Sequence, residues 1–163
     1  MRLPLIFIAV AIALRVGFFY ADIELEGFTF GFVLMGMLVL LAFISGHQLL
    51  NEEPNAPLPA LFRVGLRSTA LFALLYALFV YGFFQLLNTA EFPMRINELV
   101  HEAVATGQEE TAVRSRLESF FNPGKYAMLS FFGLLSLGAV NALFFAIMHH
   151  KLLKRFRGKS SPQ

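Results

Sequence analysis

The sequence predicts an all-α polytopic membrane protein with four transmembrane helices. Of its 163 residues, 57% are hydrophobic and 15% are charged, whereas an ordinary soluble domain is about a quarter charged. A chain this short has too much surface for its volume to hide so many apolar side chains in a soluble core. Four apolar runs in the sequence have about the 20 residues that a helix needs to cross a bilayer. They lack the alternation of barrel strands, so we expect helices.

The first predicted span contains one charge, Arg15, and the other three contain none. Arg2 before an apolar stretch resembles a signal peptide, but Arg15 interrupts the stretch, and Gly17 to Tyr20 does not form a small-x-small cleavage site. We therefore expect a retained helix. The sequence predicts a single membrane domain over residues 1–157 and a flexible tail over 158–163. The spans are predicted at residues 3–20, 28–46, 68–87 and 126–148.

The charged residues predict how the chain is threaded. An even number of spans places both termini on one side of the membrane. Eight basic and two acidic residues fall on that side, against four basic and nine acidic residues on the other. Short loops rich in Lys and Arg normally stay in the cytoplasm. Both termini are therefore predicted to be cytoplasmic.

The short loops predict which spans are neighbours. Residues 21–27 form so short an outer loop that the first two spans must be antiparallel neighbours. The inner loop, residues 51–59, contains three prolines and is predicted to be an extended connector. The third helix is expected to start near Pro59, because proline is tolerated at the first helical position. Arg63 and Arg67 then share one face of its cytoplasmic end.

The only long loop, residues 88–125, is predicted to form two short amphipathic helices outside the membrane. They are separated at Thr106-Gly107, and Thr106 with Glu109 has the spacing of a capping box for the second helix. One interpretation is that the two helices fold on each other and on the membrane surface. The alternative is that they dock a partner.

Three polar residues in or beside the spans are candidates for function. Arg15 is a charge within a span, and such charges are often functional. It also lies within reach of the outer interface and on the same helical face as Asp22, so snorkelling or pairing would explain it. Together with Asn141 and Gln85 it would line a polar path if the protein were a carrier.

Small residues in the second and fourth spans predict close helix packing. Gly138 and Ala142 are four residues apart beside Asn141, and Gly27 and Gly31 have the same spacing. Small residues at this spacing let helices approach closely in membranes.

The cytoplasmic face gathers histidines and basic residues. If His47 met His149 or His150 near Glu52 or Glu53, these side chains could hold a metal ion. Because His149 and His150 are adjacent on a helix and point about 100° apart, only one could readily join such a site. Interfacial histidines without a metal are the alternative, so no metal or cofactor is predicted. Anionic lipid headgroups are the expected partners of the basic residues, rather than nucleic acid. These candidates are Arg63, Arg67, Lys151, Lys154 and Arg155.

No catalytic motif stands in a plausible setting. The chain has no cysteine, which excludes disulfides, thiolate metal sites and cysteine nucleophiles. It also has no glycine-rich phosphate loop, HExxH helix or GxSxG elbow. The protein is therefore predicted not to be an enzyme.

Several stretches resemble a family of bacterial membrane proteins common in Bacteroidetes, domain of unknown function four-one-nine-nine. They are Phe62-Arg63-Val64-Gly65, the segment from Phe79 to Gln85, the acidic helical loop, Phe120-Phe121-Asn122-Pro123, a glycine-containing last helix and the Lys/Arg tail. The resemblance implies a small bacterial inner-membrane protein of this topology, with no established activity.

Two functions are compatible with these features. The first is a non-enzymatic accessory or scaffold subunit that binds a larger membrane protein, or another copy of itself, through small-residue helix faces and the outer segment. The alternative is a small carrier or lipid-handling protein that uses Arg15, Asn141 and Gln85.

Overall fold

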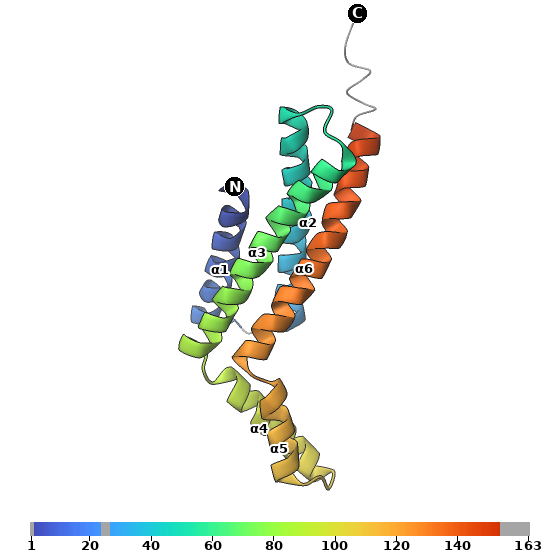
Figure 1. Ribbon diagram of the computed structural model, residues 1–163. Coiled ribbons are helices and arrows are strands. Elements are labelled where there is room, and N and C mark those ends of the chain that lie inside the picture. The colour runs from blue at the N-terminus through green and yellow to red at the C-terminus, as the bar shows by residue number, and fades with distance from the viewer. Residues whose placement is uncertain (1, 24–26, 154–163) are drawn as a thin grey trace, which may run out of the picture. The chain divides into compact units, whose positions relative to one another are not determined.

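The computed structural model describes residues 2–23 and 27–153, and every regular element in these ranges is a helix (Figure 1). Four of the helices are long and apolar enough to cross a membrane. The all-α prediction is therefore confirmed for this part of the chain. The elements are α1 Arg2–Tyr20, α2 Gly27–Glu52, α3 Leu58–Leu86, α4 Glu91–Ala105, α5 Glu110–Phe120, α6 Pro123–Met148 and the π-helix η1 His149–Leu153.

The long helices extend beyond the apolar runs that predicted them. Helix α2 continues to Glu52 rather than ending at residue 46, and α3 begins at Leu58, next to the expected Pro59. Helix α6 begins at Pro123 rather than at residue 126. The Asn122 side-chain oxygen accepts a hydrogen bond from the backbone N–H of Lys125 at 2.9 Å. An asparagine cap followed by proline at the first position explains why the helix starts there.

By its internal contacts the chain divides into two compact units. Unit 1 comprises residues 1–76 and 132–163, and unit 2 comprises residues 77–131. In unit 1, α1 packs against α2, and η1 contacts α2. Helix α1 and the part of α6 in unit 1 run in opposite directions, so the start of α1 and the end of α6 lie toward the same end of the unit (Figure 1).

Within unit 1, an apolar cluster packs the proline-rich connector against α2, α3 and α6. The backbone N–H of Ala56 donates a hydrogen bond to the Glu53 carbonyl at 2.9 Å, which turns the chain inward. The Ala56 side chain is then buried with Leu50 of α2, Leu61 of α3 and Ala146 of α6. This connector is therefore a packed turn that joins α2 to α3 and contacts α6.

Unit 2 contains the helical hairpin of α4 and α5, which pack on each other. Their apolar stripes meet in one cluster of Ile96, Val100 and Val113, with Leu117 and Phe121 packed against it. The contact agrees with the prediction that the two helices fold on each other.

The predicted capping box is wrong. Thr106 is the C-cap of α4, and its hydroxyl donates to the Ala103 carbonyl at 2.7 Å. Helix α5 starts only at Glu110, and its N-cap Glu109 makes no side-chain capping bond. Gly107 adopts a positive φ of 86° directly after α4, a conformation that glycine allows and that commonly ends a helix. The Thr106 hydroxyl therefore caps the end of α4, and it does not cap the start of α5.

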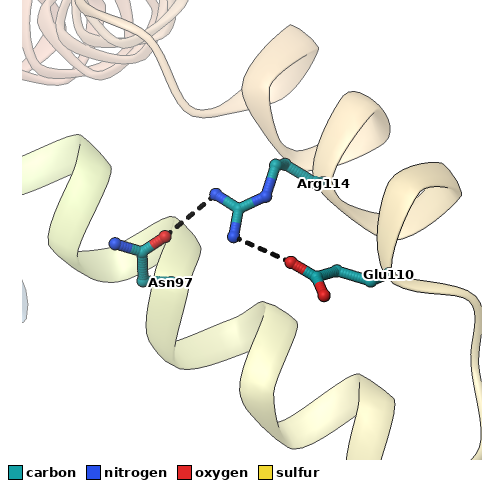
Figure 2. Close-up of polar contacts among 3 residues, drawn as sticks. All are labelled: Asn97, Glu110 and Arg114. Atoms are coloured by element: carbon teal, nitrogen blue, oxygen red, sulfur yellow. Dashed lines mark hydrogen bonds and ion pairs between the residues drawn. The ribbon is translucent and has the colours of Figure 1, made fainter.

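Polar contacts complete the hairpin at its surface. The Arg114 guanidinium of α5 donates to the Asn97 side-chain oxygen of α4 at 2.9 Å and pairs with Glu110 at 3.3 Å (Figure 2). These side chains are exposed. Exposed ion pairs contribute about 0–1 kcal/mol, so burial of the apolar stripes is the main stabilising term.

A group of aromatic rings anchors the hairpin within unit 2. The Phe84 ring of α3 lies with its centroid 4.9 Å from that of Phe92 in α4 and 5.2 Å from that of Tyr126 in α6. Aromatic pairs at this separation contribute about 0.5–1.5 kcal/mol beyond their burial. The start of α4 is therefore fixed to the chain segments that enter and leave the hairpin.

Candidate functional site

Helices α3 and α6 approach each other closely in unit 1 at two of the predicted packing residues. A Cβ added to Gly138 would lie 2.6 Å from the Cβ of Thr69, and one added to Gly65 would lie 3.1 Å from the Cβ of Ala142. Gly138 and Ala142 therefore lie in a helix contact. Gly31 has nothing within 4 Å of the position of a Cβ, and Gly27 is the first residue of α2.

Hydroxyl side chains lie beside this close contact, and the sequence analysis did not predict them. The Ser45 hydroxyl of α2 donates to the Ser68 hydroxyl of α3 at 2.9 Å. The Thr69 hydroxyl bonds back to carbonyls of its own helix, those of Gly65 and Leu66, at 3.1 Å each. Small and hydroxyl residues together are typical of tightly packed membrane helices. Gly65 and Thr69 are four residues apart in α3, a spacing that could have revealed them.

Arg15 lies over an aromatic ring. Its guanidinium carbon is 5.3 Å from the centroid of Phe30, a buried residue of α2. The Phe30 ring stacks on Tyr76 of α3 at 6.4 Å. A cation above a ring face gains about 0.5–2 kcal/mol, more where water is excluded. Arg15 thus contributes to the α1–α2 contact.

The other two polar candidates lie in separate surroundings. The Asn141 side chain donates to the carbonyl of Leu137 in its own helix at 2.8 Å. Gln85 is exposed in unit 2, on an open groove of about 290 Å³ that also includes Phe92 and Phe121.

The basic candidates that the structure describes are on the surface. Arg63 and Arg67 are exposed one helical turn apart on α3, and Lys151 is exposed on η1. This placement leaves their charges accessible to solvent or headgroups. Lys154 and Arg155 lie outside the described residues.

Two of the histidines converge. The ring centroids of His47 in α2 and His149 in η1 are 6.3 Å apart. Among the described residues, no group of three or more histidine, aspartate or glutamate side chains could hold a metal ion. His150, Glu52 and Glu53 therefore do not complete a site of that kind with the pair.

Helix α1 carries a row of small residues that the sequence analysis did not predict either. Ala9, Ala13 and Gly17 are exposed and follow one another at four-residue spacing. At 100° per residue they lie on the side of the helix away from its buried residues Ile8 and Ala11. Gly17 has nothing within 4 Å of the position of a Cβ. We call these three residues the α1 small-residue face.

Comparisons with protein-family models, with curated proteins and with solved structures find no match. Membership of the family that the sequence resembles therefore stays a prediction.

Proposed function

We propose that the protein is a multi-pass protein of the bacterial inner membrane with both termini in the cytoplasm. Support comes from α1, α2, α3 and α6, which have the length and apolarity of membrane spans. The unequal distribution of basic residues between the two sides supports the orientation. The α4–α5 hairpin would then lie outside the cytoplasm.

Single cysteines test this topology, because the natural chain has none. Gln108→Cys places a thiol in the turn of the hairpin, and Glu53→Cys places one in the proline-rich connector. In intact spheroplasts a membrane-impermeant maleimide should label Gln108→Cys, whereas Glu53→Cys should react only after the membrane is opened. The reverse pattern, or equal labelling of both, would refute the orientation.

Within the membrane we propose that the protein is a non-enzymatic accessory or scaffold subunit. The observation that carries this proposal is the exposed α1 small-residue face. Large apolar side chains already fit a lipid environment, whereas small residues at four-residue spacing let a second helix approach closely. Helix α1 buries only Pro4, Ile8 and Ala11 within the described chain. Its opposite side is free to receive a helix of a membrane partner or of a second copy.

Two substitutions to phenylalanine test whether the α1 small-residue face binds another helix. Ala13→Phe fills the middle of the face, whereas Leu14→Phe enlarges the next residue, which is 36% exposed. We expect Ala13→Phe to lower the mass of the assembly on native gels of mildly solubilised membranes, and Leu14→Phe to preserve it. Helical circular dichroism should match the natural protein for both.

A natural protein that migrates as a single chain after crosslinking in intact membranes would refute the scaffold proposal. An equal loss of assembly in both phenylalanine variants would also refute it, because bulk anywhere on α1 would then explain the effect. A lowered mass with Ala13→Phe alone would assign the contact to the face itself.

The basic surface is a second part of this proposal. Arg63 and Arg67, exposed at the cytoplasmic end of α3, together with Lys151, would hold anionic headgroups. Such contacts contribute about 1 kcal/mol for each charge near an anionic surface. They would fix the depth of the protein in the bilayer beside its partner.

A further inference from the structure

The apolar stripes of α4 and α5 are buried inside the hairpin. Ile96, Val100 and Val113 pack on one another, with Leu117 and Phe121 packed against them. An amphipathic helix that lies flat on a bilayer places such a stripe in the lipid. Because the two stripes face each other here, neither is available for that contact. A contact between the hairpin and a membrane must therefore use other residues.

Exposed apolar side chains are found where the hairpin joins the long helices. Leu86, the last residue of α3, is 81% exposed, and Phe120, the last residue of α5, is 59% exposed. Met94, in the first turn of α4, is 62% exposed. Tyr126, near the start of α6, is exposed as well. We call these four residues the hairpin base.

The rest of the hairpin surface is polar by contrast. Residues 106–111, in and after the turn, are all exposed, and five of the six have polar side chains, the other being Gly107. Residues 95–119, all of which the structure describes, expose one large apolar side chain, that of Val104. Single exposed apolar residues are common on protein surfaces. The exposed apolar surface of the hairpin is therefore concentrated at its base.

Ring contacts hold the chain segments of the hairpin base together. Phe84 of α3 contacts Phe92 of α4 and Tyr126 of α6. The Phe120 ring lies edge-on to that of Phe121, with 5.3 Å between their centroids. Phe121 in turn lines an open groove together with Phe84 and Phe92. The ends of α3 and α5 and the starts of α4 and α6 therefore meet in one region of unit 2.

The charges of α3 indicate how deep this region lies in a bilayer, a step that rests on the proposed multi-pass topology. Arg67 is the last charge in α3, and the next charge along the chain is Glu91. With Arg67 at the cytoplasmic interface, the roughly 20 residues that cross a hydrocarbon core of about 30 Å end near Leu87. The hairpin base then lies at the outer edge of the hydrocarbon, where lipid headgroups begin.

The residue types beside the hairpin base fit that depth. Tyrosine is enriched at membrane–water interfaces, where its ring meets apolar groups and its hydroxyl meets polar ones. Lys125, directly before Tyr126, is exposed and makes no ion pair with the residues that the structure describes. A lysine at this depth extends its ammonium to the headgroup layer. Apolar side chains next to such a cation match the acyl chains and the anionic phosphate of a phospholipid.

We propose that the hairpin base binds phospholipid of the extracytoplasmic leaflet, while the turn at Gly107 lies in water. The apolar surface of the hairpin base continues the exposed surface of the two spans that enter and leave it, at Tyr81 of α3 and Leu129 of α6. A soluble partner could bind any part of the hairpin. Lipid explains why the exposed apolar residues are concentrated at the end that continues into the spans.

Single tryptophans test this contact, because the natural chain has none. Met94→Trp and Phe120→Trp place the fluorophore in the hairpin base, and Gln108→Trp places it in the turn. Tyr81→Trp places it on the exposed side of the predicted span. Each full-length variant is purified and reconstituted in phosphatidylcholine vesicles, with or without bromine on the acyl chains close to the ester.

Quenching by the brominated lipid reports contact with the bilayer, since the vesicles contain no other protein. We expect Met94→Trp and Phe120→Trp to lose at least half as much fluorescence as Tyr81→Trp. Gln108→Trp should lose less than a tenth as much. The emission maxima of the two base variants should also lie at shorter wavelengths than that of Gln108→Trp. If one base variant does not fold by circular dichroism, the other decides.

Three outcomes would overturn the proposal. In the first, Tyr81→Trp is quenched and both base variants are not, so the chain spans the membrane but a second copy or a protein partner covers the hairpin base. In the second, Gln108→Trp is quenched as strongly as the base variants, so the hairpin lies along the membrane. In the third, Tyr81→Trp itself is not quenched, which refutes the proposed multi-pass topology as well.

Discussion

Replacing Gly138 with alanine should force α6 away from α3. The added Cβ would lie 2.6 Å from the Cβ and 2.7 Å from the Oγ1 of Thr69, whereas carbon atoms in contact prefer about 3.5–4 Å. The Thr69 Cβ is fixed to its backbone and cannot rotate away, so the helices must separate by about 1 Å. Overpacking of this kind costs about 1–3 kcal/mol. Because alanine favours the helix by up to about 1 kcal/mol, we expect a net loss of about 1–2 kcal/mol.

Thermal unfolding in detergent, followed by helical circular dichroism, measures this loss. For a chain of this size 1 kcal/mol corresponds to about 2–4 °C, so Gly138→Ala should unfold at least about 2 °C below the natural protein. Gly133→Ala is the matched control on the same helix, since nothing lies within 4 Å of its Cβ position. It should be neutral or slightly stabilising.

A second substitution, Thr69→Gly, should relieve the clash between the added Cβ and Thr69. Thr69→Gly removes the Cβ that Gly138→Ala would meet, so the double variant should be more stable than the sum of the two single effects predicts. We expect a coupling of at least about 0.5 kcal/mol. A Gly138→Ala protein as stable as the natural one, or an equal loss in Gly133→Ala, would refute this account of the α3–α6 contact.

Two further predictions concern the hairpin and the polar candidate in α6. Val113→Ala, which removes two carbons from the buried cluster, should destabilise the hairpin by about 2 kcal/mol and speed amide hydrogen exchange in α5. Arg114→Ala, at the exposed pair (Figure 2), should change the same exchange by less than about 1 kcal/mol; equal effects would refute the dominance of apolar burial. Asn141→Leu should leave the thermal midpoint within about 2 °C of the natural value, because its amide bonds only to its own helix in the described contacts. A larger fall would mean that Asn141 stabilises the helix contact.

The helices themselves were predictable because the length and the hydrophobic period of each one depend only on residues within that segment. Four apolar runs predicted four long helices, and the helical period of apolar residues around Ile96 and Val113 predicted two short amphipathic helices. That their two apolar stripes meet in one cluster was one of two interpretations, and the structure shows it. The ends were less predictable. Hydropathy finds where apolar residues stop, but α2 continues to Glu52 because backbone hydrogen bonding does not depend on side-chain polarity. The capping box was misassigned because Thr106 could serve either helix, and only the backbone shows which.

The candidate site was harder to predict, since it depends on how each long helix is rotated about its axis. Helices that are apolar all round have no polar face to indicate which side is buried. The sequence therefore did not distinguish Gly138 from Gly31 as a packing residue. In the structure, the Cβ position of Gly138 lies within 4 Å of another helix and that of Gly31 does not. The same ambiguity hid the α1 small-residue face, whose exposure follows from the burial of Ile8 and Ala11.

By itself the sequence determined that this chain forms helices suited to a bilayer, because composition and hydrophobic period act within each segment. It also determined that three histidines lie at the ends of two such helices. Only the tertiary structure decided that His47 and His149 meet, with 6.3 Å between their ring centroids. That distance is set by contacts between α2 and η1, residues about a hundred positions apart, whose approach depends on close packing. The residues next to each histidine in the sequence do not indicate such a contact.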